Sequence, residues 1–134
     1  MNKKNVVLTG GTGHIGSNLV KILLEKNYKV NLLIRKRSDL ADYLESLGAN
    51  LHLCNLNNKK SYENIVKNSD IAYHLAAENT TETKNRDKTI RNTYGITKSF
   101  IDCCIKNKIE KIIYTSSVVV LGRNKNEEKL ISIN

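Results

Sequence analysis

The residues best suited to chemistry in this sequence are four glycines within a seven-residue stretch near its amino terminus. Gly11, Gly13 and Gly16 have the spacing G-x-G-x-x-G, and Gly10 shares the wider spacing G-x-x-G-x-x-G with the last two. Glycine permits unusual backbone dihedrals and lets a ligand approach where a Cβ would block it. A phosphate can then contact backbone N–H groups at the positive end of a following helix. The spacing therefore predicts a phosphate-binding turn.

The surroundings of this turn favour a dinucleotide as its ligand. Val6-Val7-Leu8 precedes the turn as a short apolar strand, and an apolar helical pattern begins at Ile15. A glycine-rich turn between a strand and a helix is typical of dinucleotide-binding domains. A tight turn without a ligand is the alternative, but it does not require four glycines. The predicted cofactor contacts in this stretch are Gly10, Gly11, Thr12, Gly13, His14, Ile15 and Gly16.

The end of the second predicted strand indicates which dinucleotide is preferred. A carboxylate at this position typically binds the 2′-hydroxyl of NAD, but here the residue is Ile34. Arg35, Lys36, Arg37 and Ser38 follow, and an arginine with a serine hydroxyl suits a 2′-phosphate. We therefore expect NADP as the cofactor, bound by Arg35 and Ser38, with NAD as the alternative. A solvated charge run before a helix is the other interpretation of this cluster.

Short apolar strands alternate with helical patterns along the chain. The pattern predicts strands at 5–9, 29–34, 51–53, 71–75 and 111–115, and helices at 14–26, 38–47, 59–67 and 89–106. The apolar residues 118–120 predict an extension of the last strand, and the polar segment 78–88 predicts a loop before the long helix. Such alternation requires parallel strands joined by right-handed crossovers. We expect an α/β fold, a doubly wound parallel sheet in the order 3-2-1-4-5. Its ligand crevice would lie at the carboxyl ends of strands one and four.

Apolar spacing also predicts which helix faces are buried. The second helix would begin with Ser38 as its N-cap, end at Gly48, and bury Leu40, Tyr43, Leu44 and Leu47. The long helix would bury a stripe made of Ile90, Tyr94, Thr97, Ile101, Cys104 and Ile105.

Length and composition restrict the other classes of function. A chain of 134 residues fits a single domain, and it contains no apolar stretch of membrane length and no signal-peptide pattern, so we expect a cytoplasmic protein. Cys54, Cys103 and Cys104 are odd in number and lack C-x-x-C spacing, which indicates buried apolar residues. The net charge of +9 comes from dispersed lysines and arginines without interleaved aromatics, which argues for a solvated surface rather than nucleic-acid binding.

Four motifs in sequence order resemble those of the extended short-chain dehydrogenase/reductase family of NAD(P)-dependent epimerases, dehydratases and reductases, including dihydroflavonol-reductase-like enzymes. They are the glycine turn at 9–16, His74-Leu75-Ala76-Ala77, Asn92-Thr93-Tyr94-Gly95 and Tyr114-Thr115-Ser116-Ser117. The resemblance implies a Rossmann fold and further cofactor contacts from Asn55, Leu56, Leu75, Ala76, Ala77, Asn92 and Thr115. Asn55-Leu56 stands where the family usually has Asp-Leu beside the adenine, and asparagine keeps an acceptor oxygen.

The resemblance also implies a catalytic role for Ser117, which matches the family's substrate-orienting serine. The family's Tyr-x-x-x-Lys pair follows that serine by a few tens of residues, and this sequence ends at Asn134 before reaching it. Tyr94 and Lys98 have the same spacing, but they precede Ser117 on the Asn-x-x-Gly helix, where a tyrosine would not reach the substrate.

The resulting hypothesis is the cofactor-binding portion of an NAD(P)-dependent oxidoreductase or epimerase, truncated before the catalytic helix and inactive by itself. Its substrate would be a small molecule such as a nucleotide sugar or a flavonoid-like or steroid-like ketone. A non-catalytic NADP(H)-sensing or partner-binding module is the alternative. Because the long helix contributes to the dimer contact in related enzymes, we also expect self-association or a second polypeptide.

Overall fold

The computed structural model describes residues 3–78 and 85–117, and these residues form alternating strands and helices. In order they are β1 (Asn5–Thr9), α1 (His14–Glu25), β2 (Lys29–Ile34), α2 (Asp39–Ser46), β3 (Asn50–Leu53), a 3₁₀ turn η1 (Lys59–Ser61), α3 (Glu63–Lys67), β4 (Ile71–His74), α4 (Arg86–Lys106) and β5 (Lys111–Tyr114). The predicted extension of the fifth strand through residues 118–120 lies outside the described residues, as do residues 79–84 of the predicted loop before α4.

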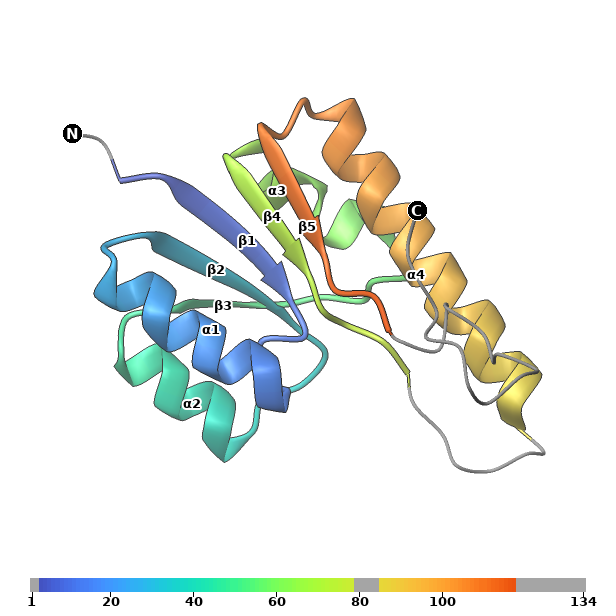
Figure 1. Ribbon diagram of the computed structural model, residues 1–134, viewed down its shortest axis with the longest axis horizontal. Coiled ribbons are helices and arrows are strands. Elements are labelled where there is room, and N and C mark those ends of the chain that lie inside the picture. Colours follow the sequence, from blue (N-terminus) through green and yellow to red (C-terminus); the bar gives the residue numbers. More distant parts are fainter. Residues whose placement is uncertain (1–2, 79–84, 118–134) are drawn as a thin grey trace, which may run out of the picture.

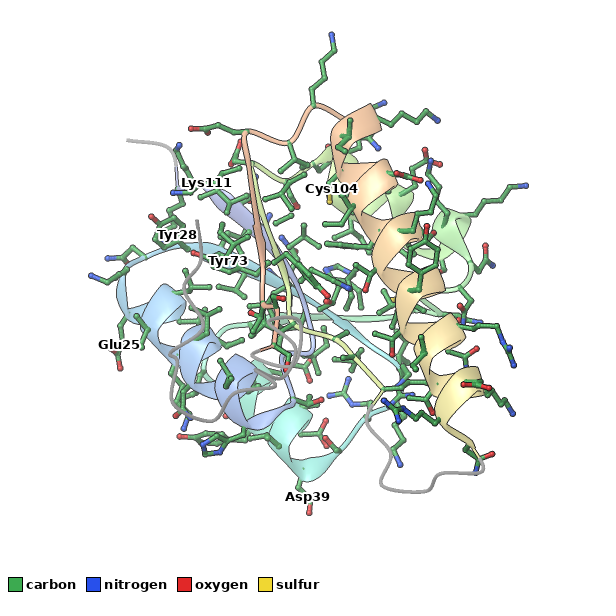
Figure 2. The ribbon with its side chains drawn as sticks, turned by 45° about the vertical axis from the view of Figure 1, so that its right-hand side comes forward. Glu25, Tyr28, Asp39, Tyr73, Cys104 and Lys111 are labelled. Atoms are coloured by element: carbon green, nitrogen blue, oxygen red, sulfur yellow. The ribbon has the colours of Figure 1, made fainter. Side chains whose placement is uncertain are left out.

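The five strands form one sheet in the order β3-β2-β1-β4-β5, and every neighbouring pair is parallel. This is the doubly wound arrangement that the sequence predicts. Helices α1 and α2 cover one face, and α3 and α4 cover the other (Figure 1). In Figure 2, Tyr28 and Lys111 mark the edge where strands begin, and Asp39 lies at the opposite end of the molecule. The strand order reverses between β1 and β4, so a ligand crevice is expected at the carboxyl end of these two strands.

Two apolar clusters hold the helices on the sheet, one on each face. Along β1, Val6 and Leu8 belong to the first cluster and Val7 to the second, because successive side chains of a strand point to opposite faces. The first cluster is completed from the covering helices by Val20, Leu23, Ala41 and Leu44, and the second by Tyr62, Val66, Ile96, Phe100, Cys103 and Cys104. A sheet buried on both faces explains why its strands are apolar almost throughout.

Helix α2 begins and ends as predicted but buries a different face. The Ser38 hydroxyl accepts a hydrogen bond from the Ala41 N–H at 3.2 Å, and Gly48 has φ +108 just after the helix. Ala41 and Leu44 are the buried residues of α2. Of the predicted inner face only Leu44 is buried, since the other three residues lie on the flanks of α2 with 36% to 49% of their surface exposed, namely Leu40, Tyr43 and Leu47.

Helix α4 begins at Arg86, so residues 86–88 are helical rather than part of the predicted loop. Its buried stripe is Ile96, Phe100, Cys103 and Cys104. Three residues of the predicted stripe are more than half exposed, namely Ile90, Tyr94 and Ile105. The prediction was right for Cys104, which is buried, and for Ile101, which packs against the second cluster. The buried face is therefore rotated from the predicted one and is centred on Ile96, Phe100 and Cys103.

Two of the three cysteines are buried, as the sequence predicts, and Cys54 is partly buried. Cys54, Cys103 and Cys104 are free thiols, and the last two are buried. Burial raises the pKa of Cys54 to about 11 and that of Cys104 to about 12, so both stay protonated at neutral pH. Within residues 3–78 and 85–117, no trio of histidine, cysteine and acidic side chains is placed to hold a metal ion. Over the same residues, no helix is long and apolar enough to cross a membrane.

Candidate functional site

A pocket of about 320 Å³ lies at the carboxyl edge of the sheet, where the strand order reverses. Its walls come from the segments that follow β1, β2, β3 and β4, together with Leu33 of β2 and Ile96 of α4. The lining residues are Gly10, Thr12, Gly13, Leu33, Arg35, Asn55, Leu56, Asn57, Leu75, Ala76, Ala77, Glu78 and Ile96. Nine of the predicted cofactor contacts therefore line the pocket, namely Gly10, Thr12, Gly13, Arg35, Asn55, Leu56, Leu75, Ala76 and Ala77.

The glycines of the turn have separate structural roles. Gly10 has φ +74, and a Cβ on it would lie 2.7 Å from the backbone nitrogen of Ala76. A Cβ on Gly16 would lie 2.1 Å from the Gly10 carbonyl oxygen, so α1 can start directly over the turn only with glycine there. Gly11 is packed against the Leu32 side chain. Gly13 lines the pocket, and a Cβ added to it would lie 3.3 Å from the Gly10 carbonyl oxygen, a less severe contact than at the other three glycines.

The first turn of α1 offers backbone donors to an anion. Gly13 is the N-cap in an extended conformation, no side chain caps the helix, and no acidic residue lies in the first turn. The N–H groups of His14 and Ile15 belong to this turn, while their side chains are exposed and do not line the pocket. A helix N-terminus without a capping side chain fits a phosphate group, which can accept hydrogen bonds from the unpaired donors.

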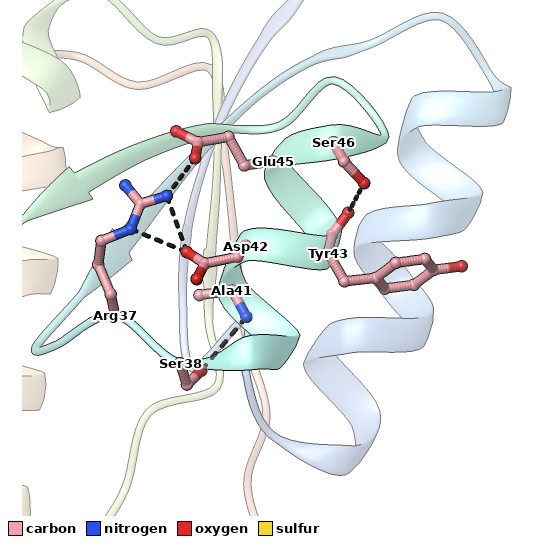
Figure 3. Close-up of polar contacts among 7 residues, drawn as sticks. All are labelled: Arg37, Ser38, Ala41, Asp42, Tyr43, Glu45 and Ser46. Atoms are coloured by element: carbon pink, nitrogen blue, oxygen red, sulfur yellow. Dashed lines mark hydrogen bonds and ion pairs between the residues drawn. The ribbon is translucent and has the colours of Figure 1, made fainter.

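The wall after β2 presents one of the three basic residues that the sequence clusters there. Arg35 lines the pocket. Arg37 is held over α2, because its guanidinium donates hydrogen bonds to Asp42, at 2.8 Å, and to Glu45 (Figure 3). These two carboxylates raise the pKa of Arg37 above its usual value. Ser38 does not line the pocket, because its hydroxyl caps α2, so the structure does not bring this predicted contact to the site.

The wall after β3 is ordered by its own asparagine. The Asn57 N–H donates to the Asn55 side-chain oxygen at 3.0 Å, and the Asn55 N–H donates to the Ser61 hydroxyl at 3.2 Å. Asn55, Leu56 and Asn57 all line the pocket. The Asn55 side-chain oxygen, which the family resemblance places beside a ligand, therefore also accepts a hydrogen bond within the loop after β3.

The wall after β4 is held by a buried chain of hydrogen bonds. The Ala76 N–H donates to the Thr9 hydroxyl oxygen at 3.2 Å, and that hydroxyl lies 2.7 Å from His74 Nδ1. His74 Nε2 lies 3.0 Å from the Thr97 hydroxyl of α4. The direction of the two bonds to the ring depends on the tautomer of His74: with the ring proton on Nε2, the Thr9 hydroxyl donates to Nδ1 and the Nε2–H donates to the Thr97 hydroxyl. The chain connects β1, β4 and α4.

His74 acts within this chain as a neutral side chain. It is fully buried and stacked between Phe100 and Tyr114, with ring centroids 5.1 and 5.7 Å away. Burial lowers the pKa of His74 to about 4, so it carries no charge at neutral pH. Sequence reasoning found the motif that contains His74 but missed its partners. The threonines at the end of β1 and on α4 were a signal, because buried threonines and histidines require hydrogen-bond partners.

A second set of contacts supports the end of the same wall. The Glu78 N–H donates to the Thr93 hydroxyl at 3.1 Å, and the Asn92 side-chain amide donates to the Glu78 carboxylate at 3.1 Å. Asn92 itself does not line the pocket, and the structure shows its side chain bonded to Glu78 instead. The sequence did not predict that Glu78 lines the pocket, because a single carboxylate at the start of a polar segment belongs to no motif of fixed spacing.

Thr115, a predicted cofactor contact, and Ser117, the predicted catalytic serine, both follow β5 and do not line the pocket. The Thr115 N–H donates to the His74 carbonyl oxygen at 3.1 Å, and both Thr115 and Ser117 are exposed. The pair with Tyr-x-x-x-Lys spacing also lies elsewhere: Tyr94 is 67% exposed, and Lys98 forms an ion pair with Asp102.

Comparison with known proteins identifies relatives that match most of the chain. A protein of Synechocystis sp. with the provisional name dihydroflavonol 4-reductase is 34% identical over 115 residues, which are 86% of this chain and 33% of the relative. The anthocyanidin reductase ((2S)-flavan-3-ol-forming) of Vitis vinifera is 27% identical over 132 residues, covering 92% of this chain and 39% of the relative. The chain thus spans between a third and two fifths of the length of these curated relatives.

A solved structure has the same fold. The UDP-glucose-4-epimerase of Stenotrophomonas maltophila, with bound NAD and formylated UDP-arabinopyranose, superposes with a TM-score of 0.80 at 15% identity and covers 94% of this chain and 40% of that one. The family model described as the NAD dependent epimerase/dehydratase family matches residues 6–133. The chain therefore belongs to the NAD dependent epimerase/dehydratase family, within the extended short-chain dehydrogenases/reductases that its motifs resemble.

Proposed function

We propose that this chain binds a nicotinamide dinucleotide at the carboxyl edge of its sheet and prefers NADP(H) to NAD(H). The observation that carries the proposal is the pocket itself. It combines the Gly10–Gly13 turn with Arg35, and the last residue of β2 is Ile34 rather than a carboxylate. A carboxylate there would repel a 2′-phosphate, whereas a guanidinium can donate two parallel hydrogen bonds to it.

The proposed role of the chain is the cofactor-binding portion of an oxidoreductase or epimerase. The relatives' names include reductases of flavonoid compounds and an epimerase of nucleotide sugars, and the substrate proposed here is a small molecule of one of these kinds. We propose that the 134 residues alone turn over no substrate, because Ser117 can orient a substrate but cannot move its proton. Self-association remains part of the proposal, supported by the exposed side chains of Ile90, Tyr94 and Ile105 on α4.

Titration of NADPH and NADH into the wild-type chain and an Arg35→Ala variant tests the cofactor preference. We expect wild type to bind NADPH more tightly, and the variant to lose about ten- to a hundredfold in NADPH affinity while NADH affinity stays the same. Lys36→Ala is the matched control, because Lys36 is an exposed neighbouring cation that does not line the pocket. Equal affinities of wild type for the two cofactors, or an unchanged preference in Arg35→Ala, would contradict the proposal.

A further inference from the structure

The order of the strands sets the direction in which a dinucleotide would lie in the pocket. The segments after β3, β2, β1 and β4 follow one another along the carboxyl edge, and they contribute Asn55, Arg35, Gly13 and Glu78 to the lining. If Arg35 meets a phosphate on the adenosine ribose and the glycine turn meets the pyrophosphate, the second nucleoside lies beside Glu78. This step rests on the proposed function.

Glu78 is fixed in place by its neighbours on α4. Thr93 contacts both backbone groups of Glu78, accepting from its N–H at 3.1 Å and donating to its carbonyl oxygen at 3.4 Å. The Asn92 side-chain amide donates to one carboxylate oxygen at 3.1 Å. Ionised carboxylates offer about four acceptor sites, so the bond from Asn92 orients the group and leaves capacity for a ligand.

A carboxylate at this end of the pocket suits only part of a dinucleotide. Glu78 is the one acidic residue among the described lining residues. Its charge would oppose the pyrophosphate, and adenine is expected at the other end, beside Asn55. A ribose offers two neighbouring hydroxyls, and hydroxyl-to-carboxylate hydrogen bonds are among the strong ones. We propose that the Glu78 carboxylate accepts hydrogen bonds from the ribose hydroxyls of the second nucleoside, the one remote from adenine.

Three probes that differ in length test this assignment in wild type and in Glu78→Gln. Adenosine 2′,5′-bisphosphate lacks the second ribose, 2′-phospho-ADP-ribose contains it, and NADPH adds the nicotinamide. We expect Glu78→Gln to weaken the two longer probes equally, by about five- to tenfold, and to leave the bisphosphate unchanged. Asn92→Leu should show the same pattern with a smaller loss, because it removes the group that orients the carboxylate.

The control is Glu110→Gln, which removes an exposed carboxylate paired with Lys4 at the edge where the strands begin. It should bind all three probes as wild type does. An equal loss for all three probes in Glu78→Gln, a loss for NADPH alone, or no loss would each overturn the assignment to the ribose. If wild type binds none of the probes, the proposed function fails instead, so the two failures are distinguishable.

Discussion

The pocket walls after β2 and after β4 are built from different interactions. After β2, the polar groups are exposed: the side chains of Arg37, Asp42 and Glu45 have 49%, 53% and 45% of their surface accessible in their ion pairs. After β4, the corresponding contacts are buried, and both Thr9 and His74 have no exposed surface. The ligand site therefore lies between a segment of solvated charges after β2, of which Arg35 reaches the lining, and a segment after β4 held by buried hydrogen bonds.

The two kinds of interaction differ in how firmly they hold the residues around the pocket. Exposed ion pairs are screened by water and salt, so they hold a side chain weakly and can be substituted at little cost in stability. A buried hydrogen-bond chain is costly to break, because the groups that lose a partner remain desolvated. We infer that the wall after β4 fixes the geometry of the pocket, and that the wall after β2 adjusts which cofactor is preferred.

The largest expected effect comes from the turn to which both walls are attached. A Cβ at Gly16 would meet the Gly10 carbonyl oxygen at 2.1 Å, and backbone cannot yield as a side chain does. Gly16→Ala should lower the free energy of unfolding by about 3 kcal/mol or more and abolish dinucleotide binding. Chemical denaturation and NADPH titration measure both effects.

The matched control for Gly16→Ala is Gly95→Ala, on α4. Nothing lies within 4 Å of a Cβ at this helical position, so the substitution should raise the free energy of unfolding by about 0.5 to 1 kcal/mol. If both variants behave alike, close approach at the turn is not what requires glycine at position 16.

The buried wall should also make stability depend on pH. The pKa of His74 is lowered to about 4 in the folded chain, against an ordinary value of 6.5. As the pH falls below 6.5, the unfolded chain takes up a proton on this residue before the folded chain does. The contribution of His74 is thus complete above pH 6.5 and is lost between 6.5 and 4, by up to about 3 kcal/mol.

Unfolding by urea between pH 4 and pH 7.5 measures this contribution. His74→Gln, which does not titrate, should show a flatter pH dependence than wild type, although its stability at neutral pH will also fall. His14→Gln serves as the control, because His14 is exposed, and it should keep the wild-type slope. A slope in His74→Gln equal to that of wild type would assign the acid sensitivity to other groups.

The sequence predicts the wall after β1 better than the other walls, for a physical reason. Positive φ and close backbone approach both restrict a position to glycine. Gly10 has a positive φ, and Gly16 lies against the Gly10 carbonyl, so both requirements are visible in the sequence as glycines. The strand order also follows from local patterns, because alternating strands and helices permit few parallel arrangements. The family motifs then identify the segments that meet at the pocket.

Contacts between distant side chains left no comparable trace in the sequence. Ser38 was assigned to a ligand, but its hydroxyl caps α2. Asn92 was assigned to the cofactor, but it bonds Glu78. Each residue type fits both roles, and only the positions of its neighbours decide between them. The buried face of α4 was predicted only in part for the same reason, because the ring contacts of Phe100 with Tyr62 and His74 join residues far apart in the sequence.

The smallest expected effect tests the adjustable wall. Arg37 is kept over α2 by Asp42 and Glu45 (Figure 3), and the double change Asp42→Asn with Glu45→Gln would release it beside Arg35. NADPH affinity should then rise by at most about threefold, because exposed ion pairs hold their partners weakly. The affinity for NADH should not change, since it lacks the 2′-phosphate.

Removing two negative charges also raises the attraction of the whole surface for anions, and this effect must be separated from the release of Arg37. Adding Arg37→Ala to the double variant removes the freed guanidinium but keeps the change in the two acidic residues. If the gain in NADPH affinity disappears in the triple variant, Arg37 was its source. If the gain persists and also extends to NADH, it comes from the general field, which salt at about 0.5 M would suppress. In that case the ion pairs of Arg37 serve only to hold the start of α2, and Arg35 alone sets the preference at this wall.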